Sequence, residues 1–252
     1  MLYLLCSILF LFASPIFAQE VLVKSFPQNN VQTDEYIQRG LTKTDKGDFA
    51  GAVRAFDTAI KASLASVAAY RHRGYAKLQL GDYMGTINDC SEVLRMNPKD
   101  SNAVLAYLYR AYAKFFLKQY EGATHDCSSA LQLDPLDDEA LSLRGMAKLQ
   151  MNDYEGAQND YSEALRINHA NAVYCFMRGQ ARAQAGDNVG AIEDFTRTLQ
   201  LEPQAFQALI HRARAKIALG DISACQDLMT AAERGSEEAL ALLSRYCSTF
   251  FK

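Results

Sequence analysis

Apolar residues recur along most of the chain at the spacing of amphipathic helices. In residues 67–100, Leu78, Ile87 and Leu94 fall at helical intervals, so each of two successive segments carries one apolar stripe. The pair Gly81-Asp82 stands between the two stripes and is typical of a helix stop followed by a turn. The pattern therefore predicts an all-α chain built from helix hairpins.

The hairpin pattern returns six times with a nearly constant period. An arginine followed by glycine or alanine recurs after 34, 37, 34, 34 and 34 residues. The pairs are Arg39-Gly40, Arg73-Gly74, Arg110-Ala111, Arg144-Gly145, Arg178-Gly179 and Arg212-Ala213. Residues 101–103 account for the longer interval, and we expect them to change the angle between the second and third hairpins. The predicted repeats are 33–66, 67–100, 104–137, 138–171, 172–205 and 206–235.

This helix–turn–helix period of 34 residues resembles the tetratricopeptide repeat family, over about four fifths of the 252 residues. The resemblance implies a right-handed superhelical α-solenoid of six hairpins, which with its cap would span residues 33–250. Because one hairpin cannot bury its own apolar stripe, neighbouring hairpins must stack and the ends must be capped. Ser236-Glu237-Glu238 is typical of a helix start, so we predict a capping helix over residues 236–250.

The recurring arginines are expected to stabilise the scaffold. Five of the six are followed by an aspartate sixteen residues later, or fifteen in the last hairpin. The pairs are Arg73 with Asp89, Arg110 with Asp126, Arg144 with Asp160, Arg178 with Asp194 and Arg212 with Asp227. A helix hairpin brings such positions together, which predicts an ion pair in each hairpin, with ligand contact as the alternative. The first hairpin has Ala55 at that place, which leaves Arg39 without its aspartate and open to a partner.

The first helix of each hairpin is the expected source of a binding surface. In the family that the repeats resemble, these helices line the concave groove of the superhelix. The residues on those faces are Arg71, His72, Tyr75, Tyr109, Tyr112, Leu143, Met146, Phe176, Met177, Gln180, His211 and Arg214, joined by Arg39. Tyrosine, methionine and arginine are enriched in protein interfaces, but packing against the next hairpin is an equal alternative for each residue. An aromatic and thioether-rich centre with basic ends predicts a groove for a protein or peptide partner.

Two functions fit such a surface. The first is a non-catalytic scaffold or adaptor that binds a partner segment in the groove. The alternative is a structural subunit of an envelope or secretion assembly that uses the convex face or the ends. One family subgroup grips the carboxylate end of chaperone tails with lysine, asparagine and arginine. The corresponding places here hold Arg71 and Tyr75, then Tyr109, then Glu139 and Leu143, so a chaperone-tail clamp is not expected.

Charge and motif content argue against other functions. The net charge is −3 and there is no long run of lysine or arginine, so nucleic acid is not an expected partner. The four histidines are scattered over different hairpins without metal-ligand spacing. Phosphate-binding loops and nucleophile elbows do not occur in the sequence. We therefore expect no enzymatic activity, no metal and no cofactor.

The first eighteen residues differ from the rest of the chain. They are almost entirely apolar and end in Pro-Ile-Phe-Ala before the polar Gln19. This pattern predicts a signal peptide over residues 1–18 and a short segment, 19–32, before the repeats. An uncleaved membrane anchor and a buried helix are the alternatives. The expected localisation is periplasmic or extracellular, without membrane insertion once the signal is cleaved.

Export would allow disulfide bonds to form. Five cysteines follow the predicted signal peptide, so at least one must be free or intermolecular. Cys225 lies ten residues before Gly235 and Cys247 twelve after it, so an antiparallel helix pair would place them roughly opposite each other. A disulfide between these two and a pair of free thiols are equal alternatives. Cys90 and Cys127 occupy the same core place in adjacent hairpins and are expected to be unpaired apolar residues.

Overall fold

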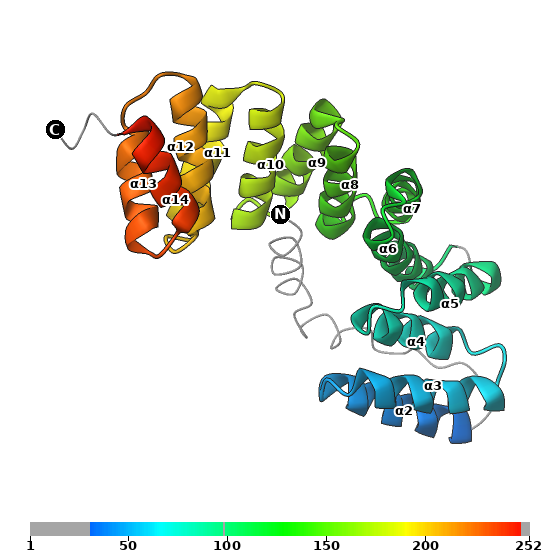
Figure 1. Cartoon of the computed structure of the whole chain (residues 1–252). Coiled ribbons are helices and arrows are strands. Elements are labelled where there is room, and N and C mark those ends of the chain that lie inside the picture. Colours follow the sequence, from blue (N-terminus) through cyan, green and yellow to red (C-terminus); the bar gives the residue numbers. More distant parts are fainter. Residues whose placement is uncertain (1–30, 98, 248–252) are drawn as a thin grey trace.

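The computed structural model describes residues 31–97 and 99–247, and every regular element in these ranges is a helix (Figure 1). Twelve helices form six hairpins, and a thirteenth follows the last hairpin. The hairpins are α2 (Val31–Asp45) with α3 (Phe49–Ala62), α4 (Val67–Gln79) with α5 (Tyr83–Met96), α6 (Ser101–Phe116) with α7 (Tyr120–Leu133), α8 (Asp138–Gln150) with α9 (Tyr154–Ile167), α10 (Ala172–Gln184) with α11 (Asn188–Leu201), and α12 (Phe206–Ala218) with α13 (Ala224–Glu233). The expected all-α solenoid is confirmed.

The hairpins follow one another along an arc, with α2 at one end and α14 (Glu237–Tyr246) at the other (Figure 1). Each helix packs against the next helix in the chain. The first helices of successive hairpins also contact one another, from α2 and α4 through to α10 and α12, whereas the second helices make at most marginal contacts of this kind. The first helices therefore form the concave wall, and the second helices form the convex side.

The Gly-Asp pair lies where the first helix of a hairpin ends and the second begins. Gly81 has a φ of 77°, which reverses the chain after α4 at no steric cost to glycine. Asp82 then caps α5, because its carboxylate accepts a hydrogen bond of 2.9 Å from the amide of Gly85. Lys118 and Asn152 adopt the same left-handed conformation in two hairpins that lack the glycine. The turn is thus set by local backbone chemistry and returns with each repeat.

The two helices of a hairpin cross where a small residue on the first faces a buried side chain on the second. A Cβ added to Gly145 would lie only 3.0 Å from the ring of Tyr161, so the close approach needs glycine there. The residue that fills this crossing is fully buried in five hairpins. It is Phe56, Cys90, Cys127, Tyr161 or Phe195. Cys90 and Cys127 are free thiols, as expected, and burial raises the pKa of each.

The hydroxyl of Tyr161 is buried and has no hydrogen-bond partner among the residues that the structure describes. Tyr161→Phe should therefore leave the free energy of unfolding unchanged or raise it by up to about 1 kcal/mol, because an unsatisfied polar group is removed. Phenylalanine already fills the same place as Phe56 and Phe195. Tyr174→Phe is the matched control, since it deletes a hydroxyl that donates to Asp138 over 3.0 Å, and it should cost about 1 kcal/mol. Urea unfolding checks both, and a clear loss of stability in Tyr161→Phe would contradict the assignment.

The three extra residues, 101–103, lengthen a helix. The helix α6 begins at Ser101 and has 16 residues, whereas α4, α8, α10 and α12 each have 13. Asp100 caps this longer helix and accepts a hydrogen bond of 3.0 Å from the amide of Ala103. The insertion is thus an additional turn at the start of α6. The expected change in hairpin angle stays a prediction.

The last helix covers the end of the final hairpin. Ala239 and Leu243 of α14 are buried against α12 and α13. A disulfide with an S–S distance of 2.08 Å joins Cys225 in α13 to Cys247, directly after α14. The structure thus adopts the bonded alternative for these two cysteines. Residues 248–250 of the expected capping helix lie outside the described residues.

The predicted signal peptide over residues 1–18 and the segment from residue 19 to residue 30 also lie outside the described residues. Within the described ranges, no helix combines the length and the apolar character needed to cross a membrane.

Candidate functional site

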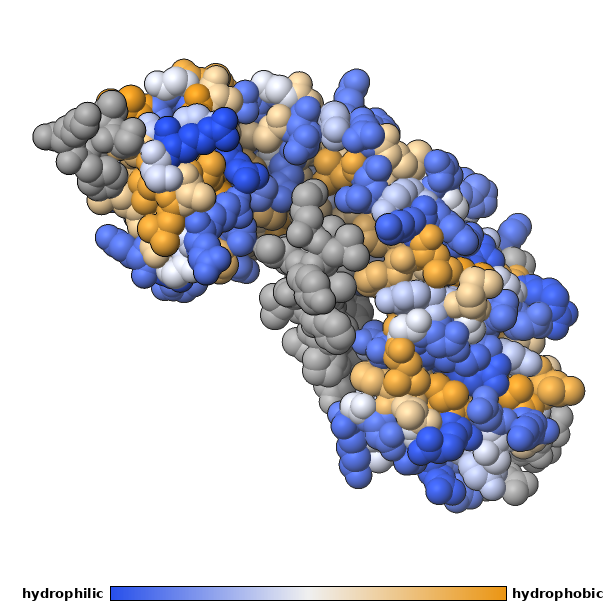
Figure 2. Space-filling view, in the orientation of Figure 1, coloured by the Kyte–Doolittle hydropathy of each residue, from blue (hydrophilic) through white to orange (hydrophobic). Residues whose placement is uncertain are grey.

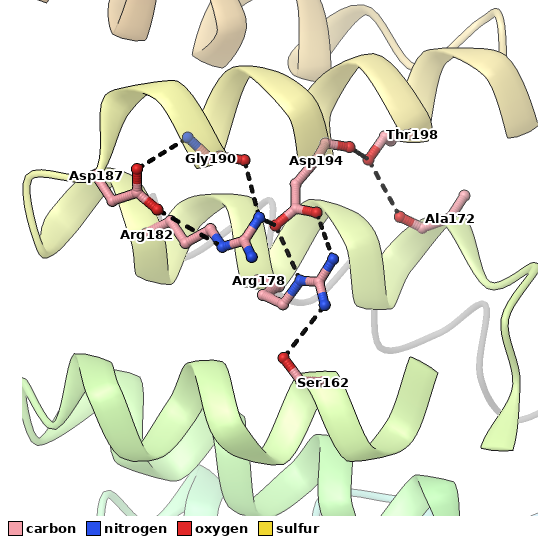
Figure 3. Close-up of polar contacts among 8 residues, drawn as sticks. All are labelled: Ser162, Ala172, Arg178, Arg182, Asp187, Gly190, Asp194 and Thr198. Carbon is pink, nitrogen blue, oxygen red and sulfur yellow. Dashed lines mark hydrogen bonds and ion pairs between the residues drawn. The ribbon is translucent and has the colours of Figure 1, made fainter. Parts of the chain in front are cut away.

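A polar ladder runs through the solenoid between the two helices of hairpins two to six. In the fifth hairpin, Asp194 of α11 accepts hydrogen bonds from Nε and Nη2 of Arg178 at 3.0 and 2.7 Å (Figure 3). Arg182, one helical turn later, contributes a second cation at 2.9 Å. The remaining Nη1 of Arg178 donates to Ser162 in the preceding hairpin over 3.2 Å. The hydrogen bonds and the charge of Asp194 raise the pKa of Arg178, so the guanidinium stays charged.

The same arrangement occurs in hairpins two to six, which confirms the predicted ion pairs. The pairs are Arg73–Asp89, Arg110–Asp126, Arg144–Asp160, Arg178–Asp194 and Arg212–Asp227. The second cation comes from Lys77, Lys114, Lys148, Arg182 or Lys216. The contacts to the preceding hairpin go to Asp57, Ser91, Ser128, Ser162 or Thr196. These arginines therefore hold the scaffold together and are not available to a ligand.

Arg39 departs from the ladder as expected, because the described residues give it no carboxylate partner. Its side chain is exposed, and its guanidinium lies 5.9 Å from the ring centroid of Tyr36. It lines a depression of about 430 Å³ together with Glu35, Lys43 and Lys46. All residues that line this depression belong to the first hairpin. Arg39 is thus separate from the rest of the predicted groove.

Five of the other predicted groove residues meet across successive first helices. Tyr75 and Tyr109 join α4 to α6, with ring centroids 5.3 Å apart. His211 of α12 contacts two residues of α10. Its ring centroid lies 5.3 Å from that of Phe176, and its Nε2 lies 3.4 Å from Nε2 of Gln180. These contacts form two parts of a row along the concave wall, one between α4 and α6 and one between α10 and α12.

Four of the predicted groove residues are buried. The exposed fraction is 1% for Leu143, 7% for Met146, 9% for Phe176 and 5% for Met177, and all four belong to the main apolar core. In the structure these four side chains pack in the core, which was the alternative to contact with a partner in the groove. The accessible part of the wall consists of the partly exposed Arg71, His72, Tyr75, Tyr109, Tyr112, Gln180 and His211 and the exposed Arg214.

The ends of the wall are less basic than the sequence indicated. Burial lowers the pKa of His72 to about 3 and that of His211 to about 4, so both rings are neutral at neutral pH. Arg214 is paired with Glu238 of α14 over 2.6 Å. Arg71 is the remaining cation of this row, and it has no carboxylate partner among the described residues. Its Nη2 lies 2.9 Å from Nε2 of His72.

The centre of the wall holds an acidic residue that was not among the predicted binding residues. The hydroxyl of Tyr112 donates a hydrogen bond of 2.8 Å to Oε1 of Glu139, which bridges α6 and α8. Burial raises the pKa of Glu139 to about 7, and the nearby Asp137 and Asp138 act in the same direction. In the sequence, Glu139 stands out only as a residue that does not fit a chaperone-tail clamp. The residue types alone gave no sign that a carboxylate would be withdrawn from water there.

Comparison with known protein families shows which family the chain belongs to. A family model described as tetratricopeptide repeat matches residues 37–100 and 142–206, together just over half of the sequence. The chain belongs to the tetratricopeptide repeat family. No curated protein sequence matches the chain at a significant level.

Solved structures of other tetratricopeptide repeat proteins share the fold. PilW, described as a widely conserved type IV pilus biogenesis factor, superposes with a TM-score of 0.73 at 16% identity and covers 85% of this chain and 100% of its own. The pilF protein of Pseudomonas aeruginosa gives 0.71 at 18% identity, over 84% and 97% of the two chains. YrrB, described as a TPR protein with an unusual peptide-binding site, gives 0.60 at 17% identity, over 69% and 88%. At these identities the likeness shows the right-handed tetratricopeptide superhelix alone.

The partly exposed side chains of this tetratricopeptide wall carry aromatic and polar groups. Within the part of the chain that the structure describes, no three histidine, cysteine or acidic residues lie close enough to hold a metal ion. The free thiol of Cys175 is buried, and burial raises its pKa. The partly exposed groups on the wall are phenols, an amide, an arginine and a carboxylate, which together suit hydrogen bonding and aromatic packing.

Proposed function

We propose that this tetratricopeptide repeat protein is a non-catalytic scaffold that holds a segment of a partner protein against its concave wall. The observation that carries the proposal is the row of contacts between successive first helices, which leaves Tyr75, Tyr109, Tyr112 and Gln180 partly exposed on one side. Tyrosine supplies large contact area with few rotatable bonds, so little conformational entropy is lost when a partner binds.

The scaffold supports this function because it presents a rigid wall. Each rung of the polar ladder ties a first helix to its own second helix and to the preceding hairpin, as Arg178 does through Asp194 and Ser162. A surface fixed in this way is ordered before the partner arrives, which lowers the cost of binding. The printed description of YrrB, which shares the fold, gives that protein a peptide-binding site.

A double variant of the wall tests the proposal. Tyr75→Ala with Gln180→Ala should weaken the binding of a fluorescent pool of short randomised peptides by about tenfold, because two contact residues of one surface are truncated. Both side chains are only partly buried, so helix content by circular dichroism should stay unchanged.

The matched control truncates apolar side chains on the convex side. Met84 of α5 and Val189 of α11 are 56% and 60% exposed, and Met84→Ala with Val189→Ala should bind the pool like the unaltered protein. Equal binding by the wall variant, or equal loss in the convex variant, would contradict placement of the site on the concave wall.

A structural subunit of an envelope or secretion assembly is the second candidate function. Large apolar side chains are exposed in the connecting loops, with Leu64 at 73%, Leu136 at 62% and Ile222 at 70%. Figure 2 shows hydrophobic patches scattered among hydrophilic residues over the visible face. PilW, which shares the fold, is described as a pilus biogenesis factor. Stable association with an assembly that survives the wall variant would favour this second function.

We also propose that the protein acts after export, in the periplasm or outside the cell. The apolar residues 1–18 and the disulfide between Cys225 and Cys247 support this location, because disulfides persist in oxidising compartments.

A further inference from the structure

Unlike the five buried aspartates of the polar ladder, Glu139 has no cationic partner among the described residues. Asp160, for example, is 4% exposed and is bound by Arg144 at 2.7 Å and Lys148 at 2.8 Å. Glu139 forms no ion pair with any described residue, and Tyr112 supplies its one side-chain hydrogen bond. A partly buried carboxylate without a cation is unfavourable, and an added cation would remove that cost.

Three tyrosines on two neighbouring helices of the concave wall are linked to this carboxylate. Tyr112 donates a hydrogen bond to it, and the charge of Glu139 acts on Tyr75 and Tyr109, whose ring centroids lie 5.3 Å apart. Burial and then the charge of Glu139 raise the pKa of Tyr75, and the same charge contributes at Tyr109. The four side chains come from α4, α6 and α8, which follow one another on the concave wall (Figure 1). All four residues are partly exposed.

The position of Glu139 at the start of α8 explains why an acid occurs there, but it does not explain why that acid is partly buried. Glu139 is the second residue of α8, where the helix dipole favours a negative charge. Glu155 is the second residue of α9 and is also acidic, yet it is exposed. What sets Glu139 apart is therefore its partial burial beside aromatic rings.

The charges nearby are mostly negative. Asp137 and Asp138 precede Glu139 in the same turn, and Asp138 is bound by the hydroxyl of Tyr174 from α10. Arg71 of α4 also lies on this part of the wall, and its charge acts on Tyr109, where it lowers the pKa that burial raises. A positively charged group would thus find an acid and electron-rich ring faces in one place.

We propose that Glu139, with Tyr75, Tyr109 and Tyr112, forms a recognition site for one lysine or arginine side chain of the partner segment. The proposal rests on the scaffold function above and names the chemistry of its partner. The cation pairs with the carboxylate while its aliphatic stem lies against the tyrosine rings. The sequence predicted basic groups at the ends of the groove but no acidic recognition residue at its centre.

Peptide pools with one fixed residue test the site. Acetylated and amidated short peptides, with lysine, arginine, leucine or glutamate fixed at each position in turn, are bound to the full-length protein and to its Glu139→Gln variant. The unaltered protein should prefer a basic pool over the leucine pool by about tenfold at one position, and Glu139→Gln should abolish that preference. Glu155→Gln is the matched control, since it removes an acid from the same helical position, and it should keep the preference.

The outcomes separate the site from the scaffold function. Peptide binding with no basic preference, or a basic preference that persists in Glu139→Gln, would overturn the proposed site and leave the scaffold function standing. Binding of no pool at all would overturn both. Circular dichroism and thermal unfolding of Glu139→Gln check that a lost preference reflects recognition, because removal of a carboxylate without a cation should not destabilise the fold.

Discussion

Asp160→Ala should lower the free energy of unfolding by about 3 kcal/mol, because it leaves two partly buried cations without their carboxylate. Asp160 accepts hydrogen bonds from Nε and Nη2 of Arg144 at 3.0 and 2.7 Å and pairs with Lys148 at 2.8 Å. Arg144 also reaches Ser128 in the preceding hairpin, so the loss should affect the contact between hairpins as well as within one. Urea unfolding followed by circular dichroism measures the change.

The control for this prediction lies on the same helix. Glu163 of α9 pairs with Arg166 at 2.9 Å, but the two side chains are 56% and 65% exposed. Glu163→Ala should therefore cost less than about 0.5 kcal/mol, since solvent screens an exposed pair. Equal losses in the two variants would show that the ladder contributes no more than an ordinary surface ion pair.

The sequence predicted the ladder because its members lie at fixed spacings within one repeat. Arg144 and Asp160 stand sixteen residues apart on the two helices of one hairpin, so the hairpin itself brings them together. The second cation, Lys148, follows Arg144 by one helical turn, and that spacing was equally present in the sequence. The contact with Ser128 was harder to foresee, since it depends on how one hairpin stacks on the next.

The binding wall was less predictable because exposure depends on the stacking of hairpins. Tyr109 and Leu143 each directly precede a ladder arginine and so hold the same place in their repeats. In the structure Tyr109 keeps some exposure, whereas Leu143 is 1% exposed and belongs to the main core. Repeat position identifies the helix and its concave side, but the neighbouring side chains decide which residues reach solvent.

The role of Glu139 could not be predicted either, because its environment also depends on how the hairpins stack. Read alone, an acid in the first turn of a helix is an ordinary partner of the helix dipole. Its distinct environment comes from Tyr112 on the preceding hairpin and from Tyr75 two hairpins away, with Tyr109 between them. None of these neighbours lies within its own repeat. Residues whose partners lie inside one repeat were predicted well, and those whose partners come from other repeats required the structure.

Loss of the disulfide should be the other large effect on stability. Cys225 and Cys247 are 22 residues apart, and closing a loop of this length lowers the entropy of the unfolded chain enough to stabilise the fold by about 3 kcal/mol. Because α14 contributes only Ala239 and Leu243 to the buried core before Cys247, the loss should fall first on this helix. Cys225→Ala with Cys247→Ala should therefore increase amide hydrogen exchange in α14, while α8 and α9 stay protected, since repeat stability is transmitted mainly between neighbours.

Reducing agent provides the internal control for the disulfide. Reduction of the unaltered protein should reproduce the exchange pattern of the double variant, whereas reductant should have no effect on the variant itself. The three remaining described cysteines, Cys90, Cys127 and Cys175, are free and buried, so reductant has no other bond to break among them. Unchanged exchange in α14 after reduction would mean that apolar packing alone holds the cap. The terminal hairpin would then be stabilised in the same way as the internal ones, by contact with its neighbour.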